Sequence, residues 1–101
     1  MEIGDRFGRN LRRERVRAKL TQEEVADRAC IHRTEVSLLE TGGRIPRLKT
    51  LLKLVGAIGT STDRLLEGID WIPAATGHGD FKVSSPKGMM TQSATSSSRR
   101  S

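Results

Sequence analysis

A short row of side chains near the middle of the chain has the types and spacing needed to contact the edges of DNA bases. Arg33, Thr34, Ser37 and Leu38 recur at intervals that bring them onto one side of a helix. An arginine guanidinium donates two hydrogen bonds to guanine, hydroxyl groups bond to several bases, and leucine contacts a thymine methyl group. We predict that these four residues face the major groove.

Two short helices joined by a tight turn must position this row. Thr21 followed by Glu24 is the pattern of a capping box, and predicts that the first helix covers about 22–29. The second helix is predicted over about 32–40. Their apolar residues have helical spacing: Val25, Ala26 and Ala29 in the first, Val36 and Leu39 in the second. A helix held against a small core in this way can enter the major groove with its other side.

The segment resembles the helix-turn-helix of the Xre family, which includes the lambda-type repressors and Cro. The resemblance covers about 7–66 and rests on an ordered set of residues: Thr21-Gln22-Glu23-Glu24-Val25-Ala26, Ile31, Val36-Ser37, Glu40, Gly42, Pro46, Leu48, Thr50 and Leu51-Leu52. It implies an all-α, five-helix, lambda-repressor-like DNA-binding domain. The chain departs from the family pattern at Cys30, where glycine is usual because the turn often requires a positive φ.

The resemblance also implies roles for single residues. Arg33 and Thr34, with Leu38 one turn further on, are expected to contact bases. Gln22 is expected to brace the recognition helix and the DNA backbone, and Arg15 to form a structural ion pair with Glu40. Residues expected to contact the DNA backbone are Thr21, Gln22, His32, Arg44 and Arg13.

Charge favours a polyanionic partner. The 101 residues carry a formal net charge of +6, and seven basic residues stand between Arg6 and Lys19 against one acidic residue, Glu14. This row is interpreted either as a solvated helix face or as a surface that contacts phosphates. The basic residues are Arg6, Arg9, Arg12, Arg13, Arg15, Arg17 and Lys19.

The remaining helices complete a domain predicted over 1–69. Helix one is expected over about 5–19, with Asp5 as its N-cap and Phe7, Leu11 and Ala18 facing inward. Helix five is expected over about 62–67, after Ser61 as N-cap. Helix four is expected over about 48–58, with one inward stripe: Leu48, Leu51, Leu52, Val55 and Ile58.

The composition changes after this domain. Residues 70–83 contain two short apolar ends around a Gly-rich centre, and we interpret them as an extended arm or weak hairpin that contributes to a dimer contact. Residues 84–101 are Ser-rich and are predicted to be disordered. The residues expected at the dimer contact are Ile69, Trp71, Ile72 and Phe81.

Catalytic and metal-binding motifs are not recognisable in this sequence. The two histidines are far apart, and one cysteine permits no internal disulfide, which suits a reducing cytoplasm. No cofactor, metal or membrane association is expected.

The prediction is a homodimeric, sequence-specific transcriptional regulator, expected to repress, that binds double-stranded DNA. The alternatives are an antitoxin or other module that binds a protein partner, and a non-specific nucleoid-type binder.

Overall fold

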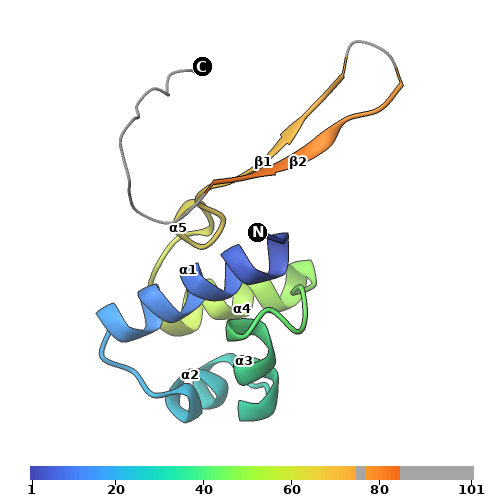
Figure 1. The fold of residues 1–101 in the computed structure, drawn as a ribbon. Helices are drawn as coiled ribbons and strands as arrows, with labels where there is room; N and C mark the ends of the chain where they lie inside the picture. Colours follow the sequence, from blue (N-terminus) through green and yellow to red (C-terminus); the bar gives the residue numbers. More distant parts are fainter. Residues whose placement is uncertain (75–76, 85–101) are drawn as a thin grey trace.

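The computed structural model describes residues 1–74 and 77–84, which form five helices followed by one hairpin (Figure 1). This agrees with the predicted all-α domain and C-terminal arm. Of the tail predicted over 84–101, residues 85–101 lie outside the described residues. The elements are α1 (Ile3–Arg17), α2 (Gln22–Ala29), α3 (Arg33–Glu40), α4 (Leu48–Ile58), α5 (Thr62–Leu65), β1 (Ile69–Ile72) and β2 (Asp80–Val83).

Helix α1 is the element around which the others are arranged. It contacts α3, α5 and both strands, whereas α2 packs between α3 and α4. Gly8 permits a close crossing of α1 and α3, because a Cβ atom at this position would lie 2.6 Å from the carbonyl oxygen of Leu39. The fully buried apolar side chains of the core are Phe7, Leu11, Val25, Val36, Leu39, Leu54 and Leu65.

The start of α2 has the predicted capping box. The Thr21 hydroxyl accepts a hydrogen bond from the Glu24 backbone N–H at 3.0 Å, and the Glu24 carboxylate accepts one from the Thr21 N–H at 2.8 Å. This second bond lowers the pKa of Glu24. At the other end of α2, Cys30 takes left-handed angles, φ 57° and ψ 46°. The turn therefore keeps the geometry for which glycine is usual.

Several predicted boundaries and orientations were wrong. Helix α1 begins at Ile3 with Glu2 as its N-cap, so Asp5 lies in the first turn. Ala18 is exposed because α1 ends at Arg17. Helix α3 begins one residue later than predicted, and α5 ends at Leu65.

The predicted inward stripe of α4 was wrong at two of its five residues, whereas Leu51 and Val55 pack against the core and Ile58 is buried, as predicted. Leu48 and Leu52 are 71% and 54% exposed, whereas Leu54 and Ala57 are buried. The apolar residues of α4 occupy a wider arc of the helix surface than the arc that packs against α2 and α5. The covered part is centred between Leu54 and Ile58.

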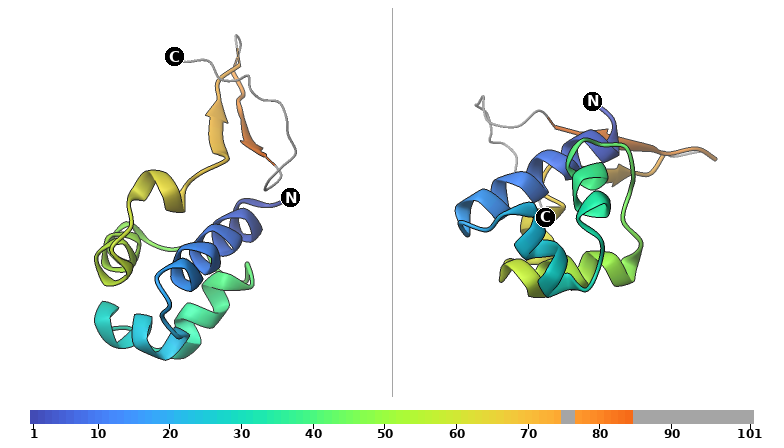
Figure 2. Two further views of the ribbon diagram at one scale, coloured as in Figure 1. Left: turned by 90° about the vertical axis from the view of Figure 1, so that its left-hand side faces the viewer. Right: turned by 90° about the horizontal axis from the view of Figure 1, so that it is seen from below.

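The arm is an antiparallel hairpin. Ile69 pairs with Val83, and Trp71 pairs with Phe81, so these four residues share one face, which we call the apolar face. The rings of Trp71 and Phe81 meet edge to face with centroids 5.0 Å apart. The other face is called the polar face, and its residues are Asp70, Ile72, Asp80 and Lys82. The hairpin projects from the side of the domain opposite α2 and α3 (Figure 2).

Candidate nucleic-acid interface

Helix α3 presents the predicted row on its outer side. Arg33 and Thr34 are exposed, and Ser37 and Leu38 are half-buried. Val36 and Leu39 are completely buried on the opposite side of the helix. The row is therefore available to a partner, and the core fixes how α3 is rotated.

A chain of polar contacts runs from α1 to the first residue of α3. Arg15 Nε lies 2.5 Å from one carboxylate oxygen of Glu40, and Arg15 Nη2 lies 3.0 Å from the other. Arg15 also donates to the Leu20 carbonyl at 2.9 Å. The Gln22 amide donates to Glu40 at 3.1 Å, and its carbonyl accepts from Arg33 at 3.4 Å. Arg33, the arginine of the row, therefore has Gln22 as a hydrogen-bond partner within the protein.

Burial separates this ion pair from ordinary surface pairs. Only 13% of the Arg15 side chain and 3% of the Glu40 side chain are exposed. The hydrogen bonds to Glu40 raise the pKa of Arg15. Such bidentate pairs hold both side chains in one geometry. The pair connects the end of α1 to the end of α3, as the resemblance implied.

The predicted backbone contacts lie on two sides of the molecule. Thr21 and Gln22 lie at the N-terminal end of α2, and the exposed His32 is the N-cap residue of α3. Arg44 is exposed and forms an ion pair with Glu35. Arg13 is not brought together with these residues.

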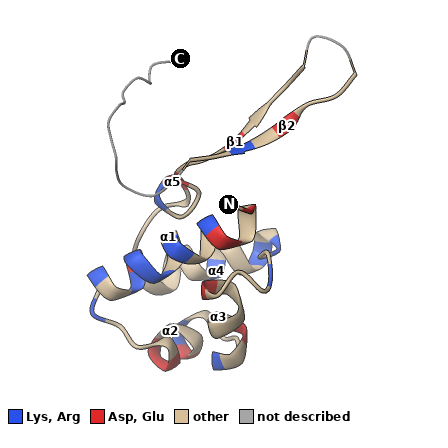
Figure 3. Ribbon diagram, in the orientation of Figure 1, with Lys and Arg blue, Asp and Glu red and all other residues tan. Residues whose placement is uncertain are grey.

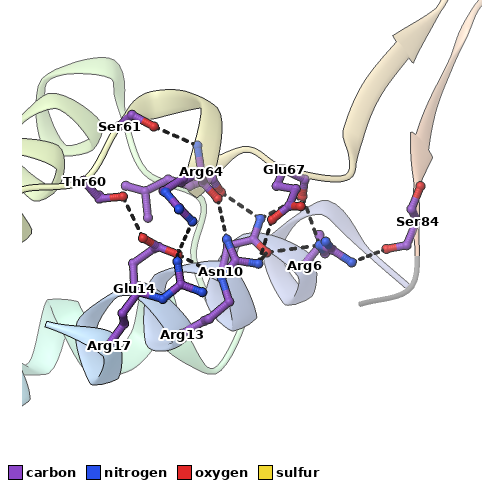
Figure 4. Close-up of polar contacts among 11 residues, drawn as sticks. Arg6, Asn10, Arg13, Glu14, Arg17, Thr60, Ser61, Arg64, Glu67 and Ser84 are labelled. Atoms are coloured by element: carbon purple, nitrogen blue, oxygen red, sulfur yellow. Dashed lines mark hydrogen bonds and ion pairs between the residues drawn. The ribbon is translucent and has the colours of Figure 1, made fainter. Parts of the chain in front are cut away.

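Arg13 instead faces α5. It lies 2.9 Å from the Glu14 carboxylate and 2.8 Å from that of Glu67, and it donates to the Arg64 carbonyl at 2.9 Å (Figure 4). These contacts place Arg13 on the side of α1 that packs against α5.

Comparison with known proteins now decides the family. A family model described as helix-turn-helix matches residues 11–65. The chain belongs to the helix-turn-helix family. The relatives found are HTH-type transcriptional regulators, so this family is one of DNA-binding regulators of transcription.

Two relatives show how far the similarity extends. The uncharacterized HTH-type transcriptional regulator y4dJ of Sinorhizobium fredii (strain NBRC 101917 / NGR234) is 40% identical over 74 residues, which are 73% of this chain and 91% of that protein. The uncharacterized HTH-type transcriptional regulator YqaE of Bacillus subtilis (strain 168) is 39% identical over 62 residues, which are 61% of this chain. The chain spans about half of YqaE, because the match covers 53% of that protein.

Solved structures share the helical fold. The restriction-modification controller protein C.AhdI from Aeromonas hydrophila is similar with a TM-score of 0.60 and 32% identity, over 61% of this chain and 94% of that one. The clp gene regulator ClgR from C. glutamicum gives a TM-score of 0.63 at 24% identity, over 65% of this chain and 86% of that one, which shows a common fold.

Helix α1 carries a buried polar stripe that was not predicted from the sequence. Arg6, Asn10 and Glu14 are 4%, 0% and 4% exposed. Their spacing of four residues places them on one side of α1, and this spacing was the available signal. Basic residues recur along α1 (Figure 3). Only some members of the basic row between Arg6 and Lys19 are exposed. The exposed members are Arg9, Arg12, Arg17 and Lys19.

Arg6 and Asn10 connect α1 to the base of the hairpin. Arg6 donates to the Glu67 carbonyl at 3.0 Å and to the Ser84 carbonyl at 2.7 Å. Asn10 donates to the carbonyls of Leu65 at 2.9 Å and Glu67 at 2.8 Å. Burial lowers the pKa of Arg6. These contacts fix the base of the hairpin relative to α1.

Glu14 is surrounded by hydrogen-bond donors and positive charges. Burial disfavours its charged form, but hydrogen bonds from Thr60 at 2.8 Å and Arg13 at 2.9 Å outweigh this effect and lower its pKa. Arg17 and Arg64 lie 3.6 Å from the same carboxylate. The stripe therefore supports the packing of α1 against α5.

Nowhere in 1–74 and 77–84 do three or more His, Cys, Asp or Glu side chains gather as metal ligands would. None of the helices in these ranges has the length and apolar character needed to cross a membrane.

Proposed function

We propose that this regulator reads operator half-sites with α3 and acts as a homodimeric repressor. The observation that carries the proposal is the exposed row on α3, held from behind by the buried pair of Arg15 and Glu40. Base discrimination requires that the contacting side chains are held in fixed positions, because a misplaced donor loses its hydrogen-bond geometry.

Arg33 is the principal base contact in this proposal. Its guanidinium reaches a guanine in the major groove, and Gln22 limits its directions from behind. Such a bidentate contact is worth about 1–3 kcal/mol of discrimination against the wrong base. Thr34, Ser37 and Leu38 complete the row with hydroxyl and apolar contacts.

Phosphates flank this row. Thr21 and Gln22 at the start of α2 and His32 at the start of α3 place helix N-termini next to the DNA backbone, where phosphate is favoured. Arg44 exchanges its Glu35 partner for a phosphate on binding. Arg13 is left out of the interface because it faces α5.

A second copy supplies the second half-site. One α3 contacts few base pairs, so a two-fold symmetric pair reads two half-sites about one helical turn, roughly 34 Å, apart. The hairpin supplies the dimer contact, since Ile69, Trp71 and Phe81 line its apolar face and Ile72 lies beside them on its polar face.

Selection of binding sites from a random pool of DNA tests the proposal. The purified chain is compared with Arg33→Ala at fixed salt, and with Arg64→Ala, which removes the same charge on the α5 side. Wild type and Arg64→Ala should enrich one two-fold symmetric site, and Arg33→Ala should lose preference at one position in each half. A pool that stays random with the wild type would overturn the proposal.

A module that binds a protein partner is the second candidate. The observation in its favour is the exposed apolar residues of α4, Leu48 and Leu52, together with the exposed Ile45 in the loop before that helix. Under this alternative, Arg33→Ala leaves DNA affinity unchanged, and Leu48→Ser with Leu52→Ser weakens capture of the partner.

A further inference from the structure

We propose that two copies of this chain associate by pairing the free edges of their β2 strands, antiparallel and centred on Phe81. The product is a four-stranded sheet across a two-fold axis, with one hairpin from each copy. The inference rests on the homodimer in the proposed function and specifies which atoms form it.

The hydrogen-bond pattern of the hairpin shows which backbone groups are free to pair. The Ser84 N–H donates to the Gly68 carbonyl at 2.8 Å, so the residue pair 68/84 is a hydrogen-bonded pair. Bonded and non-bonded pairs alternate in an antiparallel ladder. The N–H and C=O groups of Phe81 and Val83 therefore point away from β1, along the outer edge of β2.

The outer edge of β1 is less able to pair. Ile69 and Trp71 point their backbone groups outward by the same alternation, and the next outward position is Pro73. Proline has no N–H and is characteristic of strand edges that do not pair. The corresponding positions on β2 are Gly79, Phe81 and Val83, each of which has a donor and an acceptor.

Charge selects the register of the β2 pairing. With Phe81 opposite Phe81 of the second copy, Asp80 of each copy lies opposite Lys82 of the other. These two positions form non-bonded pairs, in which side chains lie closest. A shift that centres the pairing on Asp80 or on Lys82 places like charges opposite each other. The one acidic and one basic segment of β2 are visible in Figure 3.

The same register joins the exposed aromatic residues. Trp71 and Phe81 are 54% and 57% exposed in one copy, although their rings touch. A two-fold axis perpendicular to the sheet keeps both apolar faces on the same side, so four aromatic rings form one continuous surface. An isolated two-stranded hairpin is marginal in water, whereas a larger sheet with an apolar face is not.

Two complementary charge variants test this register by sedimentation equilibrium without DNA. Asp80→Lys gives an edge with two positive charges. The double variant Asp70→Lys with Lys82→Asp gives an edge with two negative charges and keeps opposite charges across its own hairpin. We expect each variant alone to dimerise at least roughly tenfold more weakly than wild type. An equimolar mixture should regain dimers, because both opposite positions are then complementary.

The control and the contrary outcomes are distinct from those of the DNA experiment. Asp27→Lys makes the same charge change as Asp80→Lys on the exposed side of α2, and should dimerise like wild type. Circular dichroism should show that all variants are folded. A monomeric wild type, an Asp80→Lys variant that dimerises like wild type, or a mixture that stays monomeric would each overturn the inference. A random DNA pool would instead overturn the proposed function and leave the sheet intact.

Discussion

Removal of one partner from the pair of Arg15 and Glu40 should destabilise the whole helical domain. In Arg15→Ala, the Glu40 carboxylate keeps only the hydrogen bond from Gln22, and the Leu20 carbonyl loses its donor. With exposed fractions of 13% and 3%, the pair is largely buried and lies closer to buried pairs, for which loss of one partner costs about 3–5 kcal/mol, than to surface pairs at ~0–1 kcal/mol. We take the lower end, about 3 kcal/mol, because Arg15 is not fully buried.

Urea unfolding followed by circular dichroism measures this loss. A domain of this size has a total stability of roughly 4–12 kcal/mol, and a slope of about 1–1.5 kcal/mol per molar urea, so the midpoint should fall by about 2–3 M. Arg17→Ala is the matched control, since its side chain is 56% exposed and lies 3.6 Å from Glu14, and it should lose under about 1 kcal/mol.

A double variant separates the ion pair from its desolvation cost. Arg15→Met with Glu40→Leu removes both charges and should be more stable than Arg15→Ala, because no buried carboxylate remains without its partner. The reasoning is refuted if Arg15→Ala loses less than about 1 kcal/mol, or if the double variant is no more stable than the single one.

Four further variants test local features by the same unfolding assay. Cys30→Gly should gain about 1 kcal/mol, because Cys30 holds left-handed angles that glycine adopts freely, and a loss would contradict this. Gly8→Ala should lose about 1–3 kcal/mol against the backbone of α3, whereas Gly56→Ala, with open space around it, should gain up to about 1 kcal/mol; effects of equal sign would contradict the crossing geometry. The pKa of Glu14 is lowered on folding, so its contribution is complete above about pH 4.5 and is lost as the pH falls through its folded pKa. Glu14→Gln should therefore reduce the fall in stability on acidification, and an unchanged acid profile would count against this role.

Local patterns in the sequence were sufficient for the helix-turn-helix itself. Thr21 and Glu24 are three residues apart and cap α2 by themselves, and the spacing of Val36 and Leu39 already orients α3. The pair of Arg15 and Glu40 is different, because its members are 25 residues apart and only the family resemblance predicted it.

The wrong predictions concern residues whose burial and contacts depend on the elements packed against them. Leu48 and Leu54 are equally apolar, and only the placement of α2 and α5 determines which one is covered. Arg6 looks like a surface arginine in the sequence, but its acceptors include two main-chain carbonyls, which have no side-chain signature. Arg13 was predicted to contact the DNA backbone as part of the basic row beside the helix-turn-helix, and its position beside Glu14 and Glu67 became evident only in three dimensions.

The contacts of Arg6 have a consequence for folding during synthesis. This guanidinium is synthesised before its acceptor carbonyls at Glu67 and Ser84, which follow 61 and 78 residues later. Until both have emerged, α1 cannot bury that face without leaving donors unpaired. The nascent helical domain therefore completes its packing only when the hairpin has closed, so the order of translation delays the stable fold to nearly the end of the described chain.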